Sequence, residues 1–185
     1  MELIEKTAKS ELIYDGVVVH LYRDIVSLPN GGESVREIIK HLGAVCIVPI
    51  TDDEEVILER QFRYAVGEIL TEIPAGKLDS ADEDPAKAAL RELKEETGAV
   101  PTELIDMGIY YGSPAIMGEK IYMFMARGLT FGERHLDDDE FLDVFKMPLS
   151  DAVNEVISGN IPDGKTQVGI LRAAKMLESE KFSRL

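Results

Sequence analysis

The sequence has little of what several classes of protein depend on. Its 185 residues include one cysteine, Cys46, and no tryptophan. A single cysteine excludes an intramolecular disulfide and a zinc site built from cysteines. Because Cys46 lies in the apolar run GAVCIVPI, we expect a small buried side chain and not a nucleophile.

Basic residues and long apolar runs are also scarce. Twenty lysines and arginines stand against 35 aspartates and glutamates, for a net charge of −15, which argues against a basic face for nucleic acid or anionic membranes. No apolar run approaches the ~20 residues of a membrane-spanning helix, and the N-terminus lacks the order of a secretory signal. We therefore expect a cytoplasmic protein that binds neither nucleic acid nor membrane. An anionic substrate would need another source of attraction.

What is present indicates one α+β domain with an N-terminal arm. The chain is 45% hydrophobic and 30% charged, as globular proteins are. Extended runs at 16–28 and 33–42 predict a hairpin-like arm, which we assign to residues 1–42, and residues 43–185 are expected to form the main domain around a central mixed sheet. The elements expected in that domain are strands at 44–50, 55–62, 69–76, 104–112, 120–129 and 141–147, and closing helices at 149–158 and 166–181.

The strongest helical pattern lies between these strands, at Pro85–Thr97. Asp84 can cap its N-terminus, Pro85 suits the first helical position, and Gly98 suits the left-handed residue just past the end. The apolar side chains expected to face the sheet are Ala86, Ala89, Leu90 and Leu93.

Three carboxylates, Glu92, Glu95 and Glu96, crowd a neighbouring arc of this helix. Like charges three or four positions apart cost roughly 0.2–0.5 kcal/mol per pair, and anions near the last turn oppose the helix dipole. Most acidic helix faces are simply solvated, and on the helix alone that interpretation is favoured. The residues in front of the helix change the balance.

The stretch EIPAGKLDSADEDPAKAALRELKEETGA, at 72–99, resembles the signature box of the Nudix hydrolases, G-x5-E-x7-R-E-U-x-E-E-x-G-U with U aliphatic. Glu83 and the run from Arg91 to Ala99 match in order. Six residues separate Gly76 from Glu83, which we interpret as a lengthened exposed loop. The resemblance implies the α+β Nudix fold, an α/β/α sandwich around a mixed sheet. It also implies that Arg91 braces the box by pairing with a glutamate such as Glu83.

The same resemblance implies a use for the crowded carboxylates. Glu92 and Glu96 would ligate Mg²⁺, with Mn²⁺ as a possible substitute. Glu95 would ligate or orient a further ion, and the carbonyl of Ala75 would be the backbone ligand. Hard divalent cations take oxygen ligands and bridge carboxylates to substrate phosphates. Such ions would reconcile an acidic protein with an anionic substrate.

Outside the box, the chain resembles the ADP-ribose pyrophosphatase branch over nearly its full length, beginning with ESVREIIKHLGAV and ERQFRYAVGEILTEIPAGKL. In that branch two subunits exchange N-terminal sheets, so the resemblance implies a homodimer with the substrate between one arm and the other core. The residues it implies as substrate contacts are Arg36, Glu37, Arg63, Ser113 and Glu119. The implied reaction is Mg²⁺-dependent hydrolysis of ADP-ribose to AMP and ribose 5-phosphate. Other nucleoside diphosphate sugars and dinucleotides stay open as substrates.

The attacking water also needs a carboxylate base, which in this branch comes from a late loop. HLDDDEF, at 135–141, is the late stretch with enough carboxylates, and aligning DEF with the branch assigns the role to Glu140. Asp139 is the alternative base. Glu140 could instead serve as a metal ligand.

A rival motif, GNIPDGKT at 159–166, fits the phosphate-loop pattern of NTPases. That loop must follow a buried strand, whereas residues 149–158 have helical spacing, so we interpret Lys165 and Thr166 as the start of the last helix. An NTPase is therefore the less favoured interpretation. A non-catalytic Nudix-like binding module is a third possibility, which the intact box argues against.

Overall fold

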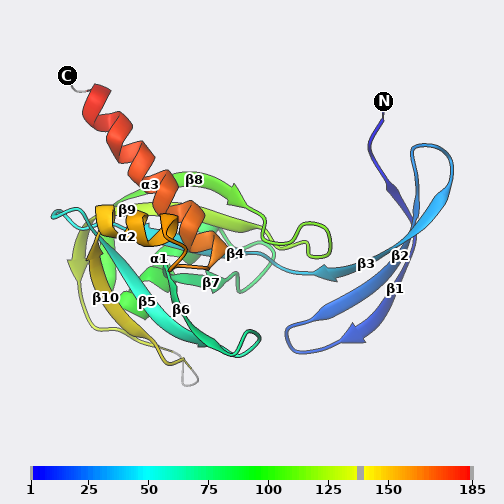
Figure 1. The fold of residues 1–185 in the computed structure, drawn as a ribbon. Coiled ribbons are helices and arrows are strands. Elements are labelled where there is room, and N and C mark those ends of the chain that lie inside the picture. The colour runs from blue at the N-terminus through cyan, green and yellow to red at the C-terminus, as the bar shows by residue number, and fades with distance from the viewer. Residues whose placement is uncertain (1, 137–139, 184–185) are drawn as a thin grey trace.

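The computed structural model describes residues 2–136 and 140–183. In those residues ten strands form three sheets, and three helices pack around two of the sheets (Figure 1). None of the described helices is both long and apolar enough to cross a membrane.

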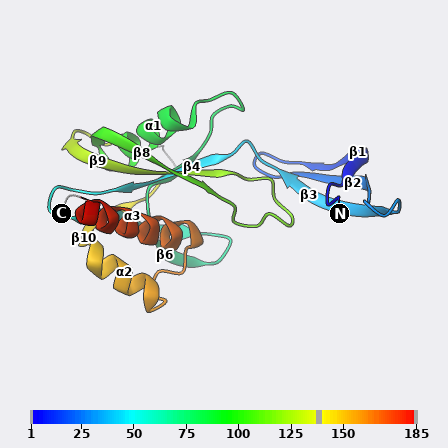
Figure 2. The same cartoon turned by 90° about the horizontal axis from the view of Figure 1, so that it is seen from above.

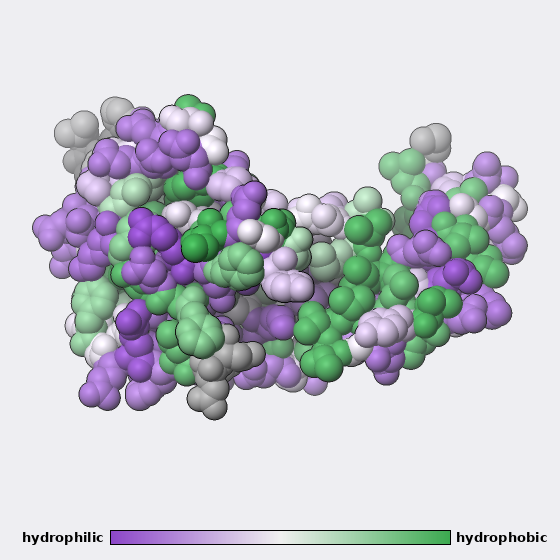
Figure 3. Space-filling model, turned by 60° about the horizontal axis from the view of Figure 1, so that its bottom comes forward, coloured by the Kyte–Doolittle hydropathy of each residue, from purple (hydrophilic) through white to green (hydrophobic). Residues whose placement is uncertain are grey.

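The N-terminal arm is an antiparallel sheet that projects from the rest of the molecule (Figures 1 and 2). Its strands are β1 (Lys6–Asp15), β2 (His20–Ser27) and β3 (Glu33–Lys40). The sequence pattern does not predict β1. All ten residues of β1 are exposed, so the strand has no buried face to produce an alternating pattern. Figure 3 shows hydrophobic residues, in green, spread over the arm.

The main domain contains two sheets. A mixed sheet has the order β7-β4-β9-β8, in which β4 and β9 run parallel, and an antiparallel sheet has the order β10-β5-β6. The strands are β4 (Ala44–Pro49), β5 (Glu55–Arg63), β6 (Glu68–Glu72), β7 (Ala75–Lys77), β8 (Ala99–Tyr110), β9 (Ile121–Phe131) and β10 (Asp143–Pro148). The prediction of one strand over 69–76 is wrong. Pro74 has no N–H to donate, and the chain passes there from β6 in one sheet to β7 in the other.

The helices cover opposite faces of the domain. Figure 2 shows α1 (Pro85–Thr97) on one side and α2 (Leu149–Ile157) and α3 (Gly164–Ser183) on the other. β4 is buried throughout and serves both layers: Val45 and Ile47 pack in the cluster with α1, while Cys46 and Val48 pack in the cluster with α2 and α3. The predicted limits of α1 match the structure, and those of the other two helices lie within two residues.

Candidate active site

Local chemistry fixes both ends of α1. Asp84 accepts a hydrogen bond from the amide of Ala86 at 2.9 Å, and Gly98, with φ 72°, donates its amide to the carbonyl of Lys94. One face of the helix packs against the sheet. Glu96 lies on that face, only 3% exposed, and its Oε2 accepts a hydrogen bond of 3.1 Å from the amide of Ala75. A carboxylate of the acidic arc is therefore buried against β7.

A close approach between β7 and α1 explains Gly76. A Cβ placed on this residue would lie 1.9 Å from the carboxyl carbon of Glu92. Any larger residue at this position would displace the Glu92 side chain. The first glycine of the box and the first glutamate of its helix are thus in contact, although they are far apart in the sequence.

Arg91 braces this arrangement, as the resemblance implies. Its Nη1 donates to Glu92 at 2.8 Å and to Glu95 at 3.3 Å, and its Nη2 donates to Glu83 at 3.4 Å. Glu83 also accepts a hydrogen bond of 2.6 Å from the amide of Asp79. The guanidinium and Glu83 thereby tie the lengthened loop to the helix.

A cavity of about 910 Å³ opens beside this helix. Its walls come from β4, β5, β6, β7, α1, the N-terminus of α3, one end each of β8 and β9, and the loops after β8 and β9. The predicted site residues that line it are Arg63, Ala75, Arg91, Glu92, Glu95, Glu119 and Glu140. The structure therefore brings most of the predicted residues to one place.

Three of the predicted substrate contacts do not line this cavity. Arg36 and Glu37 lie on β3 in the arm, where Arg36 donates to Glu5 at 2.9 and 2.5 Å. Ser113 is exposed, beside the cavity-lining Gly112. The alternative base, Asp139, lies outside the described residues.

Two buried glutamates, neither of them predicted from the sequence, adjoin the site. Glu59 on β5 and Glu72 on β6 are each 1% exposed and stand opposite one another in the strand register. The carboxylate of Glu72 accepts two hydrogen bonds of 2.7 Å from Arg63 and another from Lys165. A signal was present, because Glu59 follows Ile57 at the two-residue spacing of a core-facing strand position.

The pKa values of the buried carboxylates are shifted in different directions. Burial raises the pKa of Glu96, and the carboxylates of Glu59, Glu92 and Glu140 raise it further. Burial also raises the pKa of Glu92 to about 6, with Arg91 acting in the opposite direction. For Glu72, burial acts upward, but hydrogen bonds and charges from Arg63 and Lys165 bring its pKa below the ordinary value.

The donor set of this cluster fits a divalent cation. Glu59 Oε2 is buried without a hydrogen-bond partner, and burial together with neighbouring carboxylates raises the pKa of Glu59, Glu92 and Glu96. Within the described part of the chain, no three Asp, Glu, His or Cys side chains are arranged as a ready metal site. Arg91 contributes to this lack of a ready metal site, because it donates hydrogen bonds to both Glu92 and Glu95. Side-chain rotation would be needed to hold an ion.

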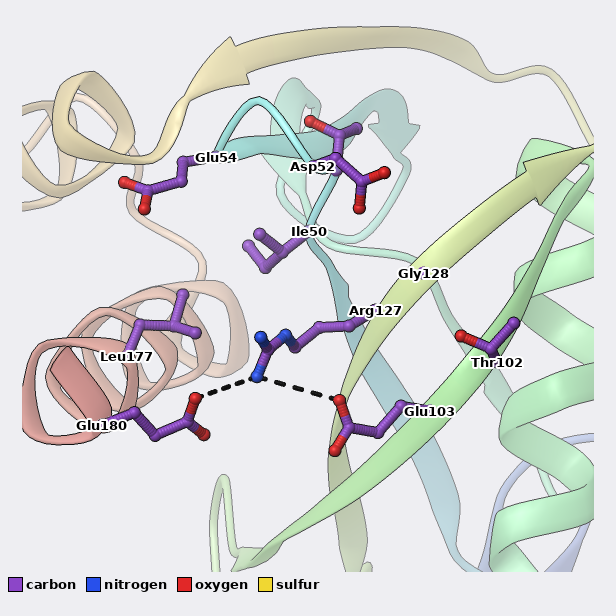
Figure 4. Close-up of a pocket in the computed structure, with 10 residues that line it drawn as sticks. Ile50, Asp52, Glu54, Thr102, Glu103, Arg127, Gly128, Leu177 and Glu180 are labelled. Atoms are coloured by element: carbon purple, nitrogen blue, oxygen red, sulfur yellow. Dashed lines mark hydrogen bonds and ion pairs between the residues drawn. The ribbon is translucent and has the colours of Figure 1, made fainter. Parts of the chain in front are cut away.

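A smaller cavity, of about 440 Å³, lies at the opposite ends of β4 and β9 (Figure 4). Arg127 reaches across it to Glu180 at 3.0 Å and to Glu103 at 3.8 Å. None of the predicted site residues lines it. We therefore place the candidate site in the larger cavity.

Comparisons with known proteins agree with this placement. Residues 40–165 match the model of the NUDIX domain. The chain belongs to the Nudix family. It is 42% identical over 183 residues to a protein named ADP-ribose pyrophosphatase from Bacillus subtilis (strain 168), covering 97% of this chain and 98% of that one. A protein named methanol dehydrogenase activator from Bacillus methanolicus is 40% identical over 168 residues, 90% of each chain.

A crystal structure described as an ADP compounds hydrolase shares the Nudix fold of this chain. Its TM-score is 0.84, it covers 97% of this chain and 98% of its own, and its sequence is 22% identical. The predicted family and the α+β fold class are confirmed. Divalent metals are in general use among Nudix hydrolases, and the acidic cluster above is where this chain could hold them.

Proposed function

We propose that this Nudix protein hydrolyses the pyrophosphate bond of ADP-ribose, giving AMP and ribose 5-phosphate. The observation that carries the proposal is that Glu92 and Glu95 of α1 line a cavity of about 910 Å³ together with the cations Arg63 and Lys165. The full-length similarity to the Bacillus subtilis protein supports ADP-ribose as the substrate.

In this proposal Glu92, Glu95, Glu96 and the Ala75 carbonyl hold Mg²⁺ or Mn²⁺. When bound, such a cation neutralises diphosphate charge and makes water more acidic. Glu140 takes the proton from the attacking water, and the water oxygen forms a bond to phosphorus as the bridging P–O bond breaks. Arg63 and Glu119, which line the cavity, hold the substrate.

We also propose that the protein works as a homodimer, with residues 1–42 as an exchanged arm and residues 43–185 as the catalytic domain. Exposed apolar side chains on the arm support this, because an uncovered apolar face favours a second chain; they include Leu12, Ile13, Val17, Val18 and Val35. Arg36 and Glu37 would then reach the site of the partner, with Ser113 beside it. Sedimentation should give twice the monomer mass. Action in the cytoplasm stays a prediction.

A panel assay tests the reaction. The protein is incubated with Mg²⁺ and ADP-ribose, other ADP-sugars, GDP-mannose, dinucleotides or ATP, and the products are identified. We expect ADP-ribose to be consumed fastest, with AMP and ribose 5-phosphate in equal amounts. Faster cleavage of another nucleoside diphosphate would change the assigned substrate. Phosphate released from ATP alone would favour a phosphate-loop NTPase, and no turnover would favour a binding module.

A further inference from the structure

The GNIPDGKT stretch at 159–166 lies beside the proposed active site, although helix α2 precedes it and it is not a phosphate loop. Asp163, Gly164 and Lys165 line the large cavity. Lys165 has a side chain only 12% exposed, and Thr166 is fully buried. A buried lysine and a buried threonine at the start of a helix need polar partners, and the structure supplies them.

Thr166 connects α3 to the strand segment in front of the box. Its hydroxyl donates to Asp163 at 2.6 Å and accepts a hydrogen bond of 3.0 Å from the amide of Ile73. Asp163 also accepts from the amide of Thr166 at 2.9 Å, which fixes the turn. The buried amide of Ile73 lies between β6 and β7, so a side chain from the other end of the chain satisfies it.

The Ile73 amide is two residues from the candidate metal site. Pro74, which restricts the backbone, separates Ile73 from Ala75, and the amide of Ala75 donates to Glu96 at 3.1 Å. A continuous path therefore runs from the Thr166 hydroxyl through this short segment to a carboxylate of the box. A shift of the segment would move both Glu96 and the Ala75 carbonyl.

Lys165 holds the same segment from its other end. Its ammonium pairs with Glu72 and lies 3.1 Å from Asp163. Glu72 also pairs with Arg63 through two hydrogen bonds of 2.7 Å. Lys165 and Arg63 thus share one buried carboxylate, and the charge that Lys165 neutralises is charge that Arg63 need not neutralise.

We propose that Thr166 and Lys165 are positioning residues of this active site: Thr166 fixes the Ile73–Ala75 segment against Glu96, and Lys165 shares Glu72 with Arg63 so that Arg63 can bind substrate phosphate. The proposal rests on the function proposed above. It gives the two residues separable effects, one on metal binding and one on substrate binding.

The role of Thr166 is tested with Thr166→Val, which keeps the shape of the side chain and removes the hydroxyl, and with Thr166→Ser, which keeps the hydroxyl. Mg²⁺ and Mn²⁺ binding is measured by calorimetry without substrate, and circular dichroism checks the fold. We expect Thr166→Val to bind metal roughly 10-fold more weakly, as loss of a ligand-orienting residue does, and Thr166→Ser to restore most of the affinity. Thr130→Val, an exposed site on β9, is the control and should bind as the wild type does. Unchanged affinity in a folded Thr166→Val protein would overturn this role.

The role of Lys165 is tested by steady-state kinetics on Lys165→Met and Lys165→Arg. The control is Lys175→Met, at an exposed lysine of α3. We expect KM for ADP-ribose to rise roughly 10-fold in Lys165→Met, with metal affinity nearly unchanged, and Lys165→Arg to recover part of the loss. A wild-type KM in Lys165→Met would overturn this role.

Failure of a variant to fold and failure of the proposed reaction give different results. Should Thr166→Val fail to fold, Thr166→Ser must still bind metal nearly as the wild type does, or the role of Thr166 is overturned. Lys165→Met must still raise KM, or the role of Lys165 is overturned. If the wild type does not cleave ADP-ribose, the proposed function fails. The calorimetry still tests whether Thr166 supports metal binding.

Discussion

Glu96 shows how a single residue links the fold to the proposed chemistry. It is buried, hydrogen-bonded to the backbone of β7, and surrounded by other carboxylates that raise its pKa. A buried like-charged cluster is unfavourable for a protein unless a cation joins it. We therefore regard Glu96 as a residue kept for function at the expense of stability.

Glu96→Gln tests this residue. Glutamine can still accept the hydrogen bond from the Ala75 amide, so we expect the variant to fold and to be more stable than the wild type without metal. Mg²⁺-dependent hydrolysis should fall by more than the roughly 10- to 100-fold typical of residues that only orient a ligand. Product release and thermal unfolding are measured beside Glu178→Gln, an exposed control on α3. Near-normal turnover would refute the metal assignment.

Glu140 has two possible roles that one variant separates. As the base, Glu140→Gln should bind Mg²⁺ with wild-type affinity and hydrolyse roughly 10²- to 10⁴-fold more slowly, the usual contribution of a general base. As a metal ligand, the same variant should lose affinity in calorimetry. Wild-type kinetics would place the base elsewhere.

At the scale of elements, the approach of α1 to β7 gives a further test. Gly76→Ala would bring a methyl group against the Glu92 carboxylate, whose flexible end can move aside without unfolding the strand. We expect a folded variant with weaker metal binding and slower hydrolysis, because Glu92 is displaced. Calorimetry and kinetics provide the measurement, and Gly132→Ala just after β9, where a Cβ meets only the Gly98 carbonyl oxygen at 3.9 Å, controls for glycine replacement. Retained metal affinity in Gly76→Ala would contradict the role of Glu92.

The sequence predicts α1 well because its ends depend on local chemistry, the Asp84 cap and the Gly98 terminator. Its buried face is predicted less well. Periodicity places Leu90 against the sheet, but this residue is 41% exposed, whereas Ala88 and Glu96 are buried. Contacts with β4 and β7 decide that rotation, and periodicity alone could not favour a buried glutamate over a leucine.

At the scale of the whole molecule, the site combines residues that are distant in sequence. Glu59, Glu72 and Lys165 come from β5, β6 and α3, and their meeting depends on strand register and helix packing. A single sequence contains the box as a continuous motif, so the box could be predicted. In the sequence, Lys165 stands out only as part of the misleading GNIPDGKT motif. Its salt bridge to Glu72 could not be predicted, because it depends on how α3 packs against β6.

The pH dependence of stability should report on the whole cluster. The pKa of Glu92 is about 6 and those of Glu59 and Glu96 are also raised, so the folded state binds more protons than the unfolded chain above the ordinary glutamate pKa. Stability gained this way is present at low pH and is lost as pH rises through the folded-state values. The lowered pKa of Glu72 changes stability only at pH values near and below the ordinary glutamate pKa.

We therefore expect the metal-free protein to unfold at a lower temperature at pH 8 than at pH 6, by at least about 3 °C. Added Mg²⁺ should raise the unfolding temperature more at pH 8, where the carboxylates are ionised. Thermal unfolding in chelator and in Mg²⁺ measures both effects, and Glu59→Gln should reduce the pH slope. A metal-free stability that rises from pH 6 to pH 8 would count against the cluster.

A crystal structure with Mg²⁺ and a non-hydrolysable ADP-ribose analogue tests the central claim most directly, namely that the carboxylates of α1 hold divalent ions against a diphosphate. The account predicts Mg²⁺ bound by Glu92 and Glu96, with the diphosphate beside it in the large cavity. Glutamate side chains turned into solvent, with no ion near them and the analogue elsewhere, would contradict it.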